Sequence, residues 1–173
     1  MLVILEGPDG AGKTTLAQKI AFSVHGVTDI RHCSQLRRNP MAEYVEDLHM
    51  YVPGTGMNIV YDRHYLGELT YGPLYRGISQ VSPSIKTAIE YRLNKLGALL
   101  VHVTHDLPTL IERCKDKGED FLQEGDIYFV RQQFIEEVAE SGIRFKAAVT
   151  DATGQDILDI IWLAQELEKR VSE

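Results

Sequence analysis

The feature that most constrains this chain is a glycine-rich segment close to its start. It matches the pattern G-x-x-x-x-G-K-[ST] and reads Gly7-Pro8-Asp9-Gly10-Ala11-Gly12-Lys13-Thr14. An apolar run over residues 2–5 precedes it, and apolar residues at helical spacing follow it over residues 14–24. This order of strand, loop and helix predicts a site for a phosphate chain. The glycines let backbone N–H groups turn toward an anion, and the helix directs its positive end at the same place.

Two side chains at the end of this loop carry the chemistry. The Lys13 ammonium can reach the β- and γ-phosphates of a nucleotide, and the Thr14 hydroxyl can bind Mg²⁺. We therefore expect ATP and Mg²⁺ as cofactors. The residues expected to hold the nucleotide are the loop and the two threonines after it: Gly7, Pro8, Asp9, Gly10, Ala11, Gly12, Lys13, Thr14 and Thr15.

Strands and helices alternate along the rest of the chain. Strands are predicted over residues 2–5, 27–32, 57–61, 98–103 and 145–149. Helices are predicted over residues 14–24, 40–51, 83–96, 107–117, 125–140 and 157–171, with a helical turn over 66–71 that Gly72-Pro73 breaks. Ser82 and Asp106 are expected to cap two of these helices. The pattern predicts one domain over residues 1–173 with a three-layer α/β/α fold of the P-loop NTPase type, a five-stranded parallel sheet, and ligands at the carboxyl ends of the strands.

Composition narrows the classes of partner. The chain has 18 Lys and Arg residues against 25 Asp and Glu residues, and this acidic balance disfavours a nucleic-acid polymer as the partner. No apolar run approaches the ~18 residues of a membrane span, and the first residues lack the basic region and cleavage site of a signal peptide. Cys33 and Cys114 are too few and too far apart for a metal motif. They are typical of reduced thiols, so we expect a cytoplasmic protein without a membrane partner.

A second anion site is predicted after the third strand, where the sequence reads Asp62-Arg63-His64. An apolar strand that ends in Asp62 suits a second Mg²⁺ ligand beside the phosphate loop, and Arg63 offers a planar fork for a phosphate. The segment that follows mixes an acceptor, an aromatic ring and a cation, which suits a sugar or base pocket. Its candidate contacts are Glu68, Tyr71 and Arg76.

Two further basic groups follow the second and fourth strands. The first holds Arg31, His32, Arg37 and Arg38, and of these His32 and Arg37 are candidate substrate contacts. The second holds Arg113, Lys115 and Lys117, where a short lid over about residues 113–125 could close on a transferred phosphoryl group.

Together these motifs resemble the thymidylate kinase family of nucleoside monophosphate kinases. The resemblance rests on the run from Leu5 to Thr15, on Asp62-Arg63-His64 with Tyr71, and on three later features: Arg113, Phe129-Val130-Arg131 and Asp151-Ala152. Gly67-Glu68, with the run from Gly72 to Gly77, is similar to kinases carried by some phages. The family's arginine-proline-glycine stretch after the second strand is absent, and the lid has fewer arginines than usual.

The resemblance implies a five-stranded parallel core, with ATP on the phosphate loop and a deoxynucleoside monophosphate opposite it. It implies that Asp9 lies near the acceptor, Arg63 holds the acceptor phosphate, and Asp62 acts through Mg²⁺ and water. It also implies that Tyr71 lines the acceptor pocket. Arg113 would flank ATP and Ala152 would border its adenine. Family members are usually homodimers, so a homodimer is implied as well.

The residues leave three functions open. The first is transfer of the γ-phosphoryl group of ATP to dTMP or another dNMP, with Lys13, Asp9, Asp62, Arg63 and Arg113 as the catalytic residues. The second is a deoxynucleoside kinase, which phosphorylates a 5′-hydroxyl and benefits from a carboxylate base such as Glu68. The third is a non-catalytic nucleotide switch, although the Asn-Lys-x-Asp pattern of guanine switches is missing.

Overall fold

The structure is a computed structural model that describes residues 1–33, 39–116 and 124–173. Within these residues five strands form one sheet in the order β2-β3-β1-β4-β5, and every neighbouring pair is parallel. The strands are β1 (Leu2–Glu6), β2 (Thr28–His32), β3 (Asn58–Asp62), β4 (Leu99–Val103) and β5 (Phe145–Val149). The predicted five-stranded parallel sheet is confirmed, and each strand begins and ends within about one residue of its predicted limits.

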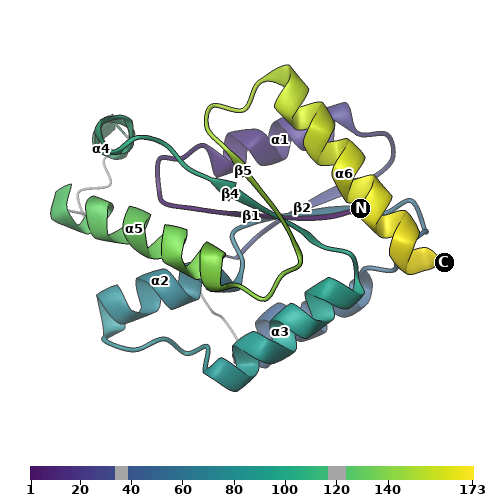
Figure 1. Ribbon diagram of the computed structural model, residues 1–173, viewed down its shortest axis with the longest axis horizontal. Helices are drawn as coiled ribbons and strands as arrows, with labels where there is room; N and C mark the ends of the chain where they lie inside the picture. Colours follow the sequence, from purple (N-terminus) through teal and green to yellow (C-terminus); the bar gives the residue numbers. More distant parts are fainter. Residues whose placement is uncertain (34–38, 117–123) are drawn as a thin grey trace.

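Helices cover both faces of this sheet, so the three-layer α/β/α fold is confirmed. Figure 1 shows α1 and α6 on one side, and α2, α3 and α5 on the other. None of the helices in the described part of the chain is long and apolar enough to cross a membrane. The helices are α1 (Lys13–Ser23), α2 (Tyr65–Arg76), α3 (Pro83–Lys95), α4 (Leu107–Asp116), α5 (Glu124–Glu140) and α6 (Gly154–Ser172).

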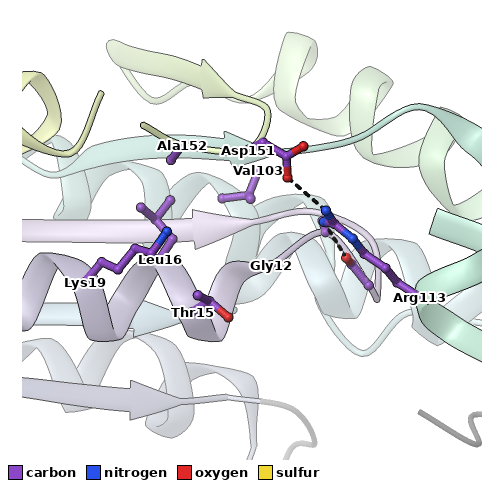
Figure 2. A pocket seen from close by; sticks show the side chains of 10 residues that line it. Gly12, Thr15, Leu16, Lys19, Val103, Arg113, Asp151 and Ala152 are labelled. Carbon is purple, nitrogen blue, oxygen red and sulfur yellow. Dashed lines mark hydrogen bonds and ion pairs between the residues drawn. The ribbon is translucent and has the colours of Figure 1, made fainter. Parts of the chain in front are cut away.

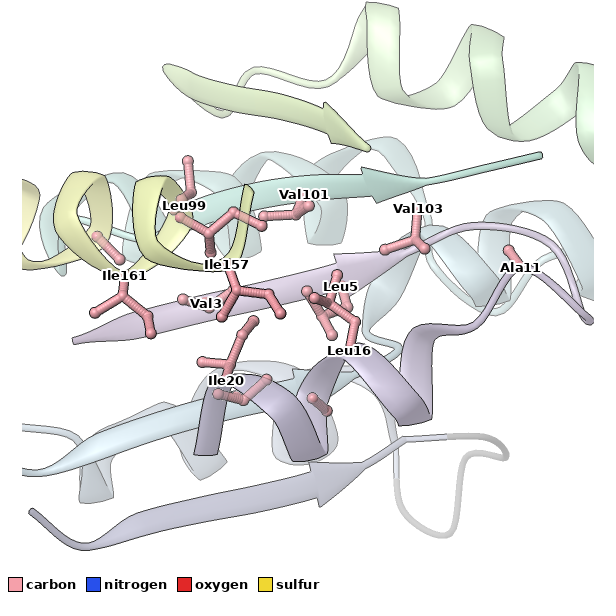
Figure 3. Close-up of a cluster of buried hydrophobic side chains, with 14 of the residues drawn as sticks. Val3, Leu5, Ala11, Leu16, Ile20, Leu99, Val101, Val103, Ile157 and Ile161 are labelled. Carbon is pink, nitrogen blue, oxygen red and sulfur yellow. The ribbon is translucent and has the colours of Figure 1, made fainter. Parts of the chain in front are cut away.

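The central strand β1 is buried on both faces, which explains its continuous apolar run. Successive side chains of a strand point to opposite faces. Val3 and Leu5 therefore pack under α1 and α6, as Figure 3 shows, whereas Ile4 packs on the side of α2, α3 and α5. The same alternation sends the last residue of the strand, Glu6, toward α2.

Local capping signals set several helix starts. The Ser82 hydroxyl accepts a hydrogen bond from the Ile85 N–H at 3.4 Å, and Asp106 accepts one from the Thr109 N–H at 2.9 Å, so both predicted caps are confirmed. Helix α6 begins earlier than predicted because Thr153 and Asp156 form a reciprocal capping box.

Two helix predictions need correction. The stretch 40–51 is not one regular α-helix: a π-helical turn over Ala42–Glu46 is followed by a 3₁₀ turn over Asp47–Met50. Arg31 and the Tyr61 hydroxyl both donate to Asp47 at this junction, so tertiary hydrogen bonds fix the irregularity. Helix α2 does not stop before Gly72-Pro73 but continues to Arg76. Its packing against α5 outweighs the one backbone hydrogen bond that Pro73 removes.

Candidate active site

The phosphate loop connects β1 to α1 at the carboxyl edge of the sheet, and its first glycine is required by space. A Cβ at Gly7 would lie 1.9 Å from the Val103 carbonyl oxygen, closer than any side chain allows. The neighbouring strand β4 thus approaches the loop backbone directly. At the other end, Gly12 has a φ of 92° and begins α1 without a side-chain cap, which leaves the helix N–H groups to an incoming anion.

Lys13 is buried at the centre of the loop. Its Nζ donates to the carbonyl oxygens of Gly7 at 2.8 Å and Pro8 at 2.7 Å. Burial, together with the nearby positive charge of Arg63, lowers the pKa of the Lys13 ammonium from 10.5 to about 8. The ammonium is therefore still protonated at neutral pH, and it is held against the loop where a phosphate chain would lie.

Thr14 and Asp62 meet because β1 and β3 are neighbours in the sheet. Leu5 pairs with Asp62 in the parallel register, and the Thr14 hydroxyl donates to Asp62 Oδ2 at 2.6 Å. The other oxygen, Asp62 Oδ1, is buried and has no hydrogen-bond partner within residues 1–33, 39–116 and 124–173. Hydroxyl and carboxylate oxygens are the ligands that Mg²⁺ prefers, so the two residues fit the ion that the sequence predicts. His32 Nδ1 lies 3.2 Å from the same Asp62 Oδ2.

Arg63, Asp9 and Tyr71 form a second polar group beside the loop. The Arg63 guanidinium pairs with the Asp9 carboxylate and lies 5.9 Å from the centre of the Tyr71 ring. The Tyr71 hydroxyl accepts the Asp9 backbone N–H at 3.1 Å. Arg63 has a φ of 74°, which non-glycine residues rarely adopt. The structure thus brings together Asp9, Arg63 and Tyr71, which the family resemblance assigns to the acceptor.

Two hollows lie along the loop. The smaller one, of about 60 Å³, lies between Asp9, Lys13, Thr14 and Arg63. The larger one, of about 460 Å³, extends along α1 to the loop after β5 (Figure 2). Because Gly10, Gly12 and Thr15 line both, the hollows adjoin each other and suit a phosphate tail that leads to a nucleoside. The larger hollow is lined by Gly10, Ala11, Gly12, Thr15, Leu16, Lys19, Val103, Arg113, Asp151 and Ala152.

The larger hollow brings together Arg113, which the family resemblance places beside ATP, and Ala152, which it places beside the adenine. Arg113 donates to Asp151 Oδ1 at 2.9 Å and to the Gly10 carbonyl at 3.4 Å (Figure 2). His105 Nε2 lies 2.6 Å from Asp151 Oδ2. Asp151, in the loop after β5, therefore holds Arg113 and His105 at the rim of the hollow, and its own φ is 46°. Sequence reasoning missed His105, whose signal was a histidine two residues after the buried strand β4.

Several predicted contacts are not brought into this group. Glu68 pairs with Arg76 and accepts the Gln80 N–H at 2.9 Å, so these two candidate substrate residues bind each other. Arg31 is held by Asp29 and Asp47 rather than left for an anion. Arg37 lies outside the described residues, as do Arg38, Lys117 and most of the predicted lid, since residues 117–123 are not described.

Two buried ionisable residues beside the loop were not predicted. Glu6 is fully buried, and its Oε1 accepts the N–H groups of His64 and Leu66, both at 2.9 Å. Burial raises the pKa of Glu6 from 4.5 to about 7. His102 pairs with Glu6 in the register of β1 and β4, and burial, helped by the charges of Arg131 and Lys13, lowers its pKa to about 4. The sequence signal for Glu6 was a carboxylate that directly follows an apolar strand and precedes the first glycine of the loop.

Comparisons with known proteins show which solved structures have a similar fold. No protein-family model and no curated protein matches the chain. A solved structure of the Bacillus subtilis YorR protein in complex with phosphorylated GDP matches with a TM-score of 0.79 and 22% identity, over 98% of both chains. The chain has the fold of the P-loop nucleotide kinases. The deoxyadenosine kinase of M. mycoides, solved with dCMP and dCDP, matches with a TM-score of 0.59 and 18% identity, over 94% of this chain and 96% of that one.

A third similar structure widens the range of chemistry found on this fold. Polyphosphate kinase 2 from Arthrobacter aurescens TC1 matches with a TM-score of 0.62 and 14% identity, over 99% of this chain and 67% of that one. At these identities the likeness concerns the fold, and function has to be argued from the site.

Proposed function

We propose that the chain is an ATP-dependent nucleoside monophosphate kinase of the thymidylate kinase type, similar to those of some phages. It transfers the γ-phosphoryl group of ATP to the 5′-phosphate of a deoxynucleoside monophosphate, dTMP or another dNMP. An acceptor phosphate oxygen bonds the γ-phosphorus while the bond to the ADP oxygen breaks, which yields ADP and a nucleoside diphosphate. As the family resemblance implies, we expect the enzyme to act as a homodimer in the cytoplasm.

The observation that carries this proposal is the adjacency of two places for anions. The phosphate loop with Lys13 and Thr14 is one, and Arg63 beside Asp9 and Tyr71 is the other. Both lie at the carboxyl ends of the neighbouring strands β1 and β3, where ligands of open α/β sheets bind. A protein that only bound ATP would need the phosphate loop but not the second anion site at Arg63.

The residues act mainly by position and charge. An acceptor phosphate is already ionised at neutral pH, so the transfer needs little help from a base. Lys13 and Arg63 neutralise charge on the two sides of the transferred group, and Arg113 adds a cation from the rim of the larger hollow. Thr14 and Asp62 would hold Mg²⁺, which supplies further neutralisation of the phosphate charge when it is bound.

The experiment measures ADP release from Mg-ATP with each common dNMP and NMP in turn. We expect turnover that depends on one acceptor or a few. Arg63→Ala should raise the acceptor KM and lower kcat, with a total loss of ~10²–10³ in kcat/KM. Arg144→Ala is the matched control, because Arg144 is exposed at the opposite edge of the sheet, where β5 begins. ADP release that no acceptor changes would contradict the proposal and favour a nucleotide switch.

A deoxynucleoside kinase is the second candidate, and the likeness to the M. mycoides deoxyadenosine kinase favours it. That reaction removes a proton from a hydroxyl and benefits from a free carboxylate. Here the Asp9 carboxylate is paired with Arg63 and the Glu68 carboxylate with Arg76, so neither is left free to face an acceptor hydroxyl. Thymidine and dTMP compared side by side as acceptors, and likewise each other deoxynucleoside and its monophosphate, distinguish the two functions.

A further inference from the structure

Glu6 connects the phosphate loop to the segment that carries Arg63. It is the last residue of β1 and stands directly before Gly7. Its carboxylate reaches across to β3 and α2, where it accepts the backbone N–H groups of His64 and Leu66, each at 2.9 Å. Helix α2 has no side-chain cap of its own at His64. The carboxylate of another strand therefore caps this helix.

The segment that Glu6 holds contains an unfavourable backbone conformation. Arg63 has a φ of 74°, and such a turn persists only where its surroundings determine it. Two consecutive residues of β1 supply this constraint. The Leu5 carbonyl accepts the Arg63 N–H at 3.0 Å, and the Glu6 carboxylate accepts the next N–H, that of His64. The turn is thereby fixed to β1 on both sides of the Arg63 Cα.

A carboxylate is unfavourable in the buried space between β1 and the start of α2, where Glu6 lies. Glu6 is fully buried, and its second oxygen, Oε2, has no hydrogen-bond partner among the residues that the structure describes. The ionisable groups that interact with it electrostatically include Lys13 from the loop and Arg63, together with Tyr44, Tyr65 and Cys33, and His102 is its partner in the register of β1 and β4. Burying a charge in this way is unfavourable unless hydrogen bonds compensate for lost water. The backbone bonds to His64 and Leu66 are the compensation that the geometry offers.

We propose that Glu6 is a positioning residue for the acceptor site. By accepting the His64 and Leu66 N–H groups it fixes the left-handed turn at Arg63 and aims the guanidinium at the acceptor phosphate. This inference rests on the proposed function, in which Arg63 binds that phosphate. Glu6 itself touches neither substrate.

The test is a double-mutant cycle between Glu6→Leu and Arg63→Ala, with acceptor KM and kcat as readouts. Leucine removes both hydrogen bonds, so we expect kcat/KM for the acceptor to fall at least about tenfold in the wild-type background and less than about twofold in the Arg63→Ala background. Equal losses in both backgrounds would overturn the proposal, because Glu6 would then act independently of Arg63. Glu90→Leu is the matched control, since Glu90 binds the Tyr65 hydroxyl of α2, which Ser141 also binds, and accepts no backbone N–H of the Arg63 turn among the described residues.

A conservative variant and a measurement without turnover complete the test. Glutamine keeps one acceptor oxygen, so Glu6→Gln should leave the acceptor KM within about threefold of wild type. A tenfold rise in KM with a folded Gln variant would overturn the proposal even if the Leu variant does not fold. Amide hydrogen exchange of His64 and Leu66 should quicken in Glu6→Leu and not in Glu6→Gln. These amides report on Glu6 even if the wild type phosphorylates no acceptor, an outcome that would refute the proposed function instead.

Discussion

Replacing Glu6 by glutamine should stabilise the protein above neutral pH and change its stability little in acid. Burial raises the pKa of Glu6 from 4.5 to about 7, although the His64 and Leu66 N–H groups and the Lys13 ammonium act in the opposite direction. A difference of one in pKa between folded and unfolded states corresponds to about 1.4 kcal/mol, so ionised Glu6 disfavours folding by about 3 kcal/mol.

The sign follows from which state binds the proton. Above about pH 4.5 the unfolded chain has lost the Glu6 proton, whereas the folded protein keeps it until about pH 7. The free energy of unfolding therefore falls as pH rises between these values, and the whole effect is present above pH 7. Glutamine carries no charge, so the free energy of unfolding of the Glu6→Gln variant does not fall through this effect as pH rises.

Urea unfolding of the wild type and Glu6→Gln at pH 5 and pH 8 measures the effect. The difference in unfolding free energy, variant minus wild type, should grow by about 2 to 3 kcal/mol between the two pH values, because a small part of the effect is already present at pH 5. Burial lowers the pKa values of His64 and His102 to about 3 and about 4, but both residues are present in both proteins and cancel in the difference. A difference that changes by less than about 1 kcal/mol would refute the reasoning from burial.

The remaining predictions concern the phosphate loop. Lys13→Met should keep the fold and lower kcat, measured as ADP release, by ~10²–10³. Lys95→Met on α3 is the control and should leave kcat unchanged. A Lys13 variant with normal kcat would show that Lys13 does not have the role assigned to it. Gly7→Ala should destabilise the protein by about 2 kcal/mol or more in thermal unfolding, because its Cβ would meet the Val103 carbonyl oxygen at 1.9 Å. At Gly125 on α5 no atom of the described residues lies within 4 Å of an added Cβ, so Gly125→Ala should be neutral or stabilising, and equal losses at both glycines would contradict the steric argument.

The sheet could be predicted from the sequence because its signals are local. A buried parallel strand is a short apolar run, and five such runs separated by helical patterns leave few arrangements. Caps behave in the same way: the Ser82 and Asp106 side chains bond N–H groups three residues ahead, so the neighbouring sequence contains all that is needed.

The failures depend on contacts between distant residues. Pro73 predicts a helix end, but α2 continues because its buried side packs on α5, which lies about sixty positions later in the chain. Arg31 lies in the densest basic cluster and suggests an anion site, but Asp47 takes its guanidinium through the irregular turn at 42–50. The local sequence around an arginine does not indicate which carboxylate will form an ion pair with it in the fold.

For the same reason, the phosphate loop of the candidate site could be predicted from the sequence, but the role of Glu6 could not. The phosphate loop is contiguous, so its pattern names every residue. Glu6 escaped notice because its role depends on the His64 and Leu66 N–H groups, which reach it only when β1 and β3 lie side by side. A charged residue that interrupts an apolar strand directly before a glycine loop is the signal that could have found it.

The distribution of unfavourable features argues that this edge of the sheet is a working site rather than a glycine turn. In the described part of the chain, Arg63 and Asp151 are the non-glycine residues with positive φ, and they stand beside the smaller and the larger hollow. Between them lie a buried carboxylate, Glu6, with its pKa raised to about 7 and a buried ammonium, Lys13, with its pKa lowered to about 8. Each feature lowers stability, and a chain needing only a stable sheet gains nothing from placing them together. Their gathering around two adjoining hollows supports the proposal that this edge of the sheet binds two phosphorylated ligands.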